Sequence, residues 1–125
     1  LAGRGKQVFV DLKFHDVPAT VAATLKGLAR YPVTFCTIHG QQDAMMRAAS
    51  QEKGAIKLLA VTVLTSMDGS DLRRLGIDRE PSQAVLERAT AAREAGCDGA
   101  SQARRRARDH RHAPGEVEQP SGYRL

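Results

Sequence analysis

Two residues of opposite charge stand two positions apart at the end of a short apolar segment. The segment reads VFVDLKF over residues 8–14, with Asp11 and Lys13 on either side of Leu12. Because successive side chains of a strand point to opposite faces, Asp11 and Lys13 are predicted to share one face, with Leu12 pointing outward. A carboxylate beside an ammonium is costly to desolvate, so folds keep such a pair mainly where it does chemistry. A satisfied ion pair at a strand end fits the bare motif equally well, and both interpretations stay open at this point.

The elements that must position this pair follow from the hydrophobic pattern. Strands are predicted over residues 8–12, 33–38 and 56–64, with a fourth beginning at Cys97. Helices are predicted over residues 18–30, 42–52, 70–75 and from Pro81 to just before Gly96. The third strand is almost continuously apolar, which indicates burial on both faces, as in a parallel sheet.

The spacing of these elements predicts an α/β fold. Strands start about 25 residues apart with a helix in each gap, which is the βα repeat of a parallel sheet. A complete eight-unit barrel needs roughly 250 residues. This chain has 125 residues, enough for about three βα units and the start of a fourth. If the fold is a barrel, less than half of it is present.

Composition excludes some classes of protein. No apolar run reaches the roughly 20 residues that span a bilayer, and the first residues lack a signal-peptide pattern. Cys36 and Cys97 are far apart and belong to no Cys-x-x-Cys motif or Cys/His cluster. They are predicted to be reduced, buried thiols of a cytoplasmic protein.

The last quarter of the chain differs from the rest. Residues 100–125 contain six arginines and three acidic residues, and they lack hydrophobic periodicity. We therefore predict a domain over residues 1–99 and an Arg-rich, disordered tail over residues 100–125. The tail has the composition of a shifted reading frame of GC-rich coding sequence, and we favour that origin over a basic tail that binds nucleic acid through its arginines.

Three motifs resemble one enzyme family. VFVDLKFHDVPAT at residues 8–20 is similar to the signature of the orotidine 5′-phosphate decarboxylases. LAVTVLTSMDGSDLRRLG at residues 59–76 looks like that family's fifth strand and following loop, and AREAGCDG at residues 92–99 looks like the approach to its sixth. The order and spacing also match, over about residues 5–99 and none of the tail.

The resemblance implies a (β/α)8 TIM barrel, here a partial one, that is usually a homodimer with active sites near the dimer interface. It implies that Lys13 is the proton donor and that Asp11 is the carboxylate beside it, facing the carboxylate of the substrate. It further implies that Asp16 is the acid that reaches the active site of the partner subunit. These three are the expected catalytic residues.

The resemblance also implies the residues that bind the nucleotide substrate, orotidine 5′-phosphate, and its product UMP. Asp11 and Lys13 are expected to contact the substrate, Thr20 to lie with Asp16 at the interface, and Thr65 and Ser66 to contact the pyrimidine. A fixed ammonium beside the carbon that loses CO₂ stabilises and then protonates the carbanion, so no metal and no cofactor are expected.

This sequence also departs from the family pattern. Residues matching the family's first two strands are absent. An acid and a second lysine of the family's charged network are therefore absent too. The strands after the fifth are also absent, and so are the arginine and the glutamine that hold the substrate phosphate in the family. We therefore expect these 125 residues alone to be inactive and poorly stable, since three parallel strands leave two unpaired edges.

Two other functions are weighed. A sugar-phosphate decarboxylase or synthase of the same barrel superfamily shares D-x-K-x-x-D, but the loop with Thr65 and Ser66 argues against it. The hypothesis of a small basic nucleic-acid-binding protein is supported only by residues 104–124, and these lack interleaved aromatic residues for stacking. Nucleic acid and membrane are therefore not expected partners.

His39, at the end of the second strand, is expected to form structural hydrogen bonds, and His15 is assigned no function.

Overall fold

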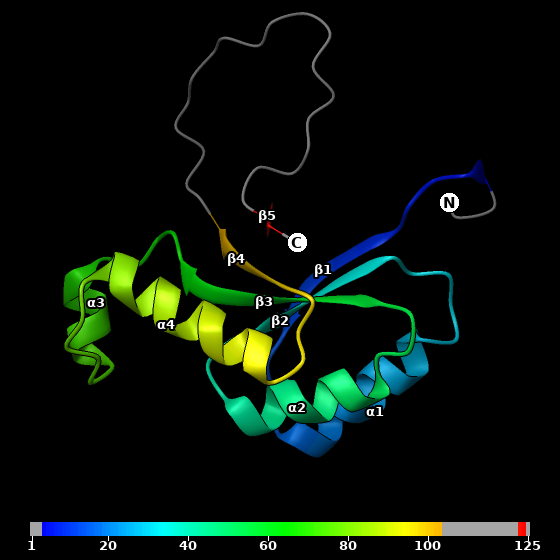
Figure 1. Ribbon diagram of the computed structural model, residues 1–125, viewed down its shortest axis with the longest axis horizontal. Helices are drawn as coiled ribbons and strands as arrows, with labels where there is room; N and C mark the ends of the chain where they lie inside the picture. Colours follow the sequence, from blue (N-terminus) through cyan, green and yellow to red (C-terminus); the bar gives the residue numbers. More distant parts are fainter. Residues whose placement is uncertain (1–3, 104–122, 125) are drawn as a thin grey trace, which may run out of the picture.

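The strands and helices alternate along the chain. The computed structural model describes residues 4–103 and 123–124. Its elements, in chain order, are β1 (Phe9–Phe14), α1 (Pro18–Leu28), β2 (Phe35–His39), α2 (Asp43–Glu52), β3 (Lys57–Leu64), α3 (Gly69–Arg74), α4 (Pro81–Glu94), β4 (Gly99–Ala103) and β5 (Tyr123–Arg124) (Figure 1). The predicted α/β alternation is confirmed. Proline occupies the first turn of α1 and of α4, where its missing N–H costs no helix hydrogen bond.

The first four strands of the five-stranded sheet are parallel and lie in the same order in which they occur in the chain. The order is β1-β2-β3-β4-β5, so each of the first four strands lies beside the one before it. The pairs β1–β2, β2–β3 and β3–β4 are all parallel. Sequential parallel order with a helix in each crossover is the arrangement of a (β/α)8 barrel, here over part of its circumference.

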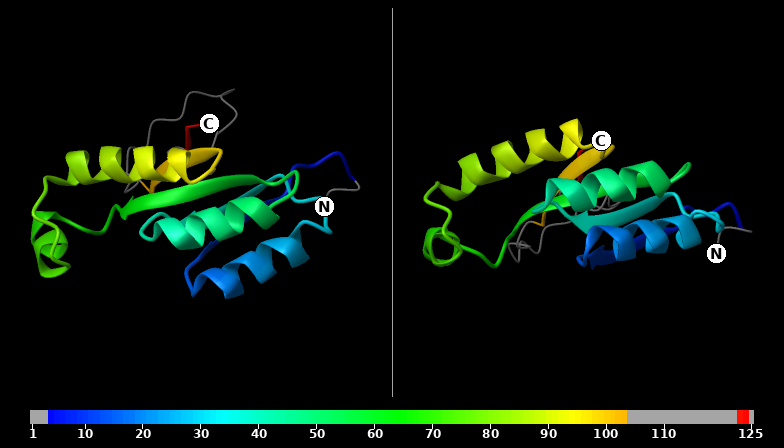
Figure 2. Two further views of the ribbon diagram at one scale, coloured as in Figure 1. Left: turned by 60° about the horizontal axis from the view of Figure 1, so that its bottom comes forward. Right: turned by 90° about the horizontal axis from the view of Figure 1, so that it is seen from below.

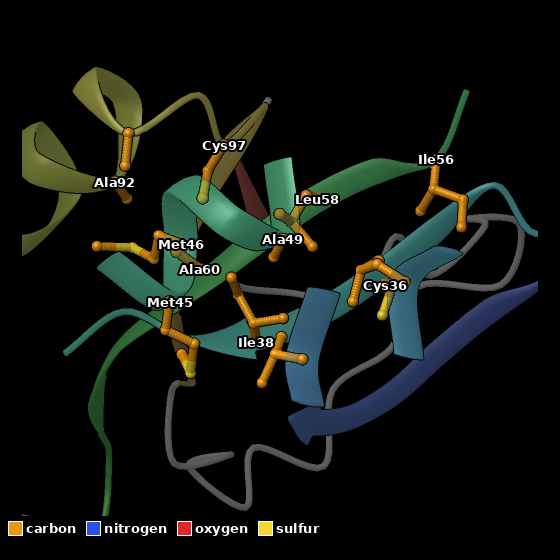
Figure 3. Packing of buried hydrophobic residues seen from close by; sticks show 13 residues of the cluster. Cys36, Ile38, Met45, Met46, Ala49, Ile56, Leu58, Ala60, Ala92 and Cys97 are labelled. Carbon is orange, nitrogen blue, oxygen red and sulfur yellow. The ribbon is translucent and has the colours of Figure 1, made fainter. Parts of the chain in front are cut away.

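Helices α1, α2 and α4 pack on one face of the sheet and bury a continuous apolar core. Strand residues Cys36, Ile38, Leu58 and Ala60 contact residues of α1, α2 and α4 in this cluster (Figure 3). Helices α1 and α2 lie side by side below the sheet, and α4 lies along β3 (Figure 2). Because strand side chains alternate, the residues between these, such as Thr37, face the opposite side of the sheet.

The third strand is buried as its apolar run predicted. Residues 58–63 of β3 are all buried. A second, smaller apolar cluster joins the end of β3 to the helices that follow it, through Val63, Leu72 and Ala84. Helix α3 lies beyond the end of β3 (Figure 1).

The cysteines are buried free thiols, as predicted. Burial, and then the charge of Asp11, raises the pKa of Cys36 to about 11. Burial likewise raises the pKa of Cys97 to about 11. Both thiols are therefore protonated at neutral pH and behave as small apolar groups.

Several strand boundaries differ from the sequence prediction, and two of these differences bear on the candidate site and on the predicted domain boundary. Strand β1 continues to Phe14, past the predicted end at residue 12. Strand β4 continues through residues 100–103, past the domain boundary predicted at residue 99. Ser101 is buried, and the hydroxyl of Thr62 donates to its backbone carbonyl at 3.0 Å. Pairing with β3 thus outweighs the weak strand propensity of the small residues Ala100 and Ser101.

The predicted disordered tail is corrected at the few positions that the structure describes. Residues 100–103 belong to β4, and Tyr123 and Arg124 form β5, which pairs antiparallel with β4. The other tail residues, and with them most of the proposed nucleic-acid-binding segment, lie outside the described residues. Within the described ranges, no helix combines the length and apolar character needed to cross a membrane.

Candidate active site

The charged pair lies in a bulge of β1. Val10 is paired with Cys36 and Phe14 with Ile38, so four steps along β1 correspond to two along β2. The extra residues bend the strand and re-aim its side chains, which is a common device beside active sites. The intervening residues include both Asp11 and Lys13. Simple strand alternation therefore does not describe their orientation, although it was the basis of the sequence prediction.

Lys13 has a left-handed backbone. Its φ is 49°, the only positive φ of a non-glycine residue in the described ranges. Such a conformation costs a residue with a side chain on the order of 1–3 kcal/mol and persists only where its surroundings impose it. Strain of this kind concentrates at functional sites, so it adds to the case for Lys13.

Asp11 and Lys13 form the predicted ion pair. The ammonium Nζ of Lys13 lies 2.9 Å from Oδ1 of Asp11. The side chains are 32% exposed for Lys13 and 38% for Asp11, so both can reach a molecule from solvent. Leu12, between them, is 68% exposed, in agreement with its predicted outward orientation. The pair is neither separated onto two faces nor sealed away from solvent.

Thr37 of β2 forms hydrogen bonds with both residues of the pair. Its hydroxyl donates to Oδ1 of Asp11 at 2.7 Å and accepts the backbone N–H of Lys13 at 3.1 Å. Thr37 is fully buried. Sequence reasoning missed it, because a threonine in a β-branched strand is the expected residue type. Its one signal is that it is a polar residue close to the end of an apolar segment.

Two histidine rings lie at the same end of the sheet. The rings of His15 and His39 are 4.8 Å apart between centroids, with a tilt of 36°. Burial lowers the pKa of His39 below its ordinary value, and electrostatic interaction with His15, Lys13 and Arg88 lowers it further. The His39 imidazole is therefore neutral at pH 7 and can either donate or accept a hydrogen bond.

The loop after β3 contains two more predicted site residues. Thr65 and Ser66 lie in a turn in which the N–H of Met67 donates to the carbonyl of Leu64 at 2.9 Å. Thr65 is partly buried and Ser66 exposed. Beyond the turn, Asp68 caps α3 in a reciprocal capping box with Asp71, so the loop is fixed at both ends.

The structure brings these groups to one edge of the sheet. Lys13, His39 and the turn at Thr65 stand at the carboxyl ends of β1, β2 and β3, which are parallel. In barrels built from such strands this edge holds the active site.

Asp16 and Thr20 are not part of the Asp11–Lys13–Thr37 cluster. The carboxylate of Asp16 accepts the backbone N–H of Val17 at 2.7 Å. Thr20 lies in the first turn of α1, where its carbonyl accepts the hydroxyl of Thr24 at 2.9 Å. Both side chains are exposed at the start of α1, so they are available to a molecule outside this chain.

Metal-ligand groups are not gathered in the described part of the chain. No three His, Cys, Asp or Glu side chains there are grouped as they would be around a metal ion.

Comparison with known proteins decides the family. The model of the "Orotidine 5'-phosphate decarboxylase / HUMPS family" matches residues 1–120. The chain belongs to this family. Its match extends past residue 99, where the sequence motifs predicted that the resemblance would end.

Named relatives of the orotidine 5′-phosphate decarboxylase family are similar to this chain. Orotidine 5′-phosphate decarboxylase of Xanthomonas oryzae pv. oryzae (strain PXO99A) is 59% identical over 100 residues, which are 79% of this chain and 41% of the relative. The enzyme of Xanthomonas campestris pv. campestris (strain B100) is 57% identical over the same coverage. The chain thus matches about two fifths of the length of these relatives.

Two solved structures share the fold. Orotidine 5′-phosphate decarboxylase from Lactobacillus acidophilus is similar with a TM-score of 0.73 and 34% identity, over 79% of this chain and 49% of that chain. An uncharacterized conserved protein from Geobacillus kaustophilus has a TM-score of 0.75 and 37% identity, over 80% and 51%. These similarities support the partial TIM barrel inferred from the sheet order.

Proposed function

We propose that the full-length protein containing this segment is an orotidine 5′-phosphate decarboxylase, which converts orotidine 5′-phosphate to UMP and CO₂ in pyrimidine biosynthesis. The observation that carries the proposal is the ion pair of Asp11 and Lys13. It combines a partly exposed ammonium, a fixed carboxylate and a strained backbone at the carboxyl edge of a parallel sheet. The family membership and the names of the relatives supply the reaction.

Lys13 is the proposed acid. Loss of CO₂ from the pyrimidine ring leaves an electron pair on carbon with little resonance stabilisation. An ammonium held next to that carbon stabilises the negative charge and then donates a proton to it. The salt bridge at 2.9 Å keeps the ammonium oriented before the substrate arrives.

Asp11 is the proposed partner of that acid and faces the carboxylate of the substrate. Repulsion between the two carboxylates is relieved when CO₂ leaves, which favours the reaction if the site excludes water. The Asp11 carboxylate also balances the charge of Lys13 in the free site.

The remaining site residues are assigned by family motif. Thr65 and Ser66 would contact the pyrimidine, since they lie in the turn that follows β3. Asp16 and Thr20, exposed at the start of α1, would act across a homodimer interface. We place the enzyme in the cytoplasm, in keeping with its free, protonated thiols.

A hybrid chain tests this function. The 100 residues matched in the Xanthomonas oryzae relative are replaced by their counterparts from this protein, which joins the segment to the rest of a barrel. We expect the hybrid to release CO₂ from carboxyl-labelled orotidine 5′-phosphate, whereas the 125-residue chain alone releases none.

A substrate panel separates the rival function. A sugar-phosphate enzyme of the same superfamily would act on a ketose phosphate and leave orotidine 5′-phosphate unchanged. A folded hybrid, verified by circular dichroism, that acts only on the sugar phosphate would replace our assignment. Turnover by the 125-residue chain would instead overturn the expectation that this chain is incomplete as a catalyst.

A further inference from the structure

Thr37 has an environment that a purely structural threonine does not need. It is fully buried on β2, on the sheet face opposite the helices. Its hydroxyl reaches across to β1 and meets two separate groups there, one on a side chain and one on the backbone.

The two contacts use the hydroxyl both as a donor and as an acceptor. A hydroxyl has one hydrogen to donate and lone pairs to accept with. Thr37 donates to Oδ1 of Asp11 at 2.7 Å and accepts the N–H of Lys13 at 3.1 Å. The same Oδ1 accepts the ammonium of Lys13 at 2.9 Å. One hydroxyl therefore ties together the carboxylate and the backbone from which the ammonium extends.

The bulge explains why a side chain is needed here. Between Val10 and Phe14 the register of β1 against β2 shifts, so the regular ladder is interrupted at Lys13. The Lys13 N–H finds its acceptor in the Thr37 hydroxyl. The left-handed φ of 49° at Lys13 is a conformation that persists only where surrounding contacts impose it.

Thr62 provides a comparison within the same sheet. It is also buried, on the adjacent strand β3, and its hydroxyl donates to the backbone carbonyl of Ser101 at 3.0 Å. That contact joins two strands and involves no charged group. The two threonines are thus similarly buried, but the Thr37 hydroxyl contacts the charged pair and the Thr62 hydroxyl contacts a backbone carbonyl.

We propose that Thr37 is a positioning residue for the Asp11–Lys13 pair: its hydroxyl holds the carboxylate and the lysine backbone in the geometry that decarboxylation requires. The inference rests on the proposed function, since the benefit of this geometry lies in the reaction assigned to Lys13. Thr37 itself acts through the other two residues.

Turnover of the hybrid chain gives the first test. Thr37→Val keeps the branched shape and removes the hydroxyl, and Thr37→Ser keeps the hydroxyl. We expect Thr37→Val to lower kcat by about ten- to a hundredfold, the range for a misplaced reacting group, with KM changed less than about threefold. Thr37→Ser should recover kcat to within about threefold of the parent.

The matched control is Thr62→Val in the same hybrid. It removes a buried hydroxyl from the next strand and leaves the charged pair untouched. We expect its kcat to stay within about threefold of the parent. Equal losses of kcat in the two valine variants, or no loss in Thr37→Val, would overturn the proposal.

Amide hydrogen exchange gives a second test that needs no turnover. In the 125-residue chain the Lys13 amide should be protected, and Thr37→Val should speed its exchange by roughly tenfold because the acceptor is gone. The Gly40 amide, which donates to the carbonyl of Val61 at 2.8 Å, should change little and reports on general loosening.

The two tests fail in different ways. If the parent hybrid is folded but inactive, the proposed function is wrong, and the catalytic part of this inference is wrong with it. The exchange experiment still decides whether the Thr37 hydroxyl holds the Lys13 backbone. An unprotected Lys13 amide in the parent chain, or equal acceleration at Lys13 and Gly40, would overturn the positioning role even if turnover is normal.

Discussion

At the scale of the residue, Lys13 combines the two features expected of a catalytic group, a fixed partner and a strained backbone. The contact with Asp11 could be predicted from the D-x-K spacing, and it is present at 2.9 Å. The left-handed φ of 49° at Lys13 could not be predicted from the sequence, because it depends on the register of β1 against β2. Local sequence carries information on which side chains are close, and much less on a backbone conformation that a neighbouring strand imposes.

The strain at Lys13 predicts an unusual order of stabilities. Lys13→Gly and Lys13→Ala both remove the ammonium, but only glycine adopts a left-handed backbone without steric cost. We expect the unfolding free energy of Lys13→Gly to exceed that of Lys13→Ala by about 1 kcal/mol, measured by urea denaturation.

The matched control for this comparison is Lys26, in the last turn of α1. At an ordinary helical position alanine is favoured over glycine, by roughly 0.5–1 kcal/mol. The order should therefore reverse between the two sites. If alanine is the more stable variant at both positions, the left-handed conformation of Lys13 is wrong.

At the scale of the element, Asp98 holds the start of β4 in place. Its carboxylate lies 2.8 Å from Nζ of Lys53, which follows α2, and accepts the backbone N–H of Leu58 on β3 at 2.9 Å. The end of α2, strand β3 and the start of β4 thus meet at one carboxylate. The sequence predicted a strand that begins near Cys97, but the extension of β4 to Ala103 depends on pairing with β3 and on these tertiary contacts.

The charge of Asp98 predicts a dependence of stability on pH. Burial by itself raises the pKa of Asp98, but the hydrogen bonds from Lys53 and Leu58 outweigh it, and the net pKa lies below the ordinary value of 3.8. A lowered folded-state pKa gives stability that is present above the unfolded pKa and is lost as the pH falls through the folded one. Asp98→Asn should therefore cost on the order of 2 kcal/mol at pH 7, and the difference from the parent should shrink below about pH 4.

Glu87→Gln is the control for Asp98→Asn. Glu87 pairs with Arg79 at 3.2 Å, but both side chains are more than half exposed, at 52% and 53%. Removing the charge there should change the unfolding free energy by less than about 0.5 kcal/mol at any pH. A constant loss for Asp98→Asn between pH 7 and pH 3 would contradict the assignment of its stabilising role to the ionised form.

At the scale of the molecule, the chain is part of a parallel barrel with the candidate site on its carboxyl edge. The βα spacing and the motifs were sufficient to predict the fold class and the family, since both depend on patterns that are local in sequence. The role of Thr37 could not be predicted in this way, because nothing in its residue type marks a hydroxyl that reaches two groups on another strand. The same applies to the His15–His39 ring contact, which joins residues from two strand ends.

The organisation of the sheet also bears on stability. Strand β1 is an edge of the sheet, and β5 rather than solvent lies beside β4. Among the described residues the sheet therefore keeps the two edges that were expected, with β5 in place of β4 at one of them. Strand β1, which carries Asp11 and Lys13, is the other edge, and this places the candidate site beside a position where another strand can pair.

The most direct test of the account is turnover by Lys13→Ala in the hybrid chain, measured as CO₂ release beside UMP binding by calorimetry. We predict that kcat falls by at least about ten-thousandfold, because both charge stabilisation and proton donation are lost. UMP affinity should stay within about threefold of the parent. Near-normal turnover in Lys13→Ala would contradict the claim that this lysine, held by Asp11, carries the reaction.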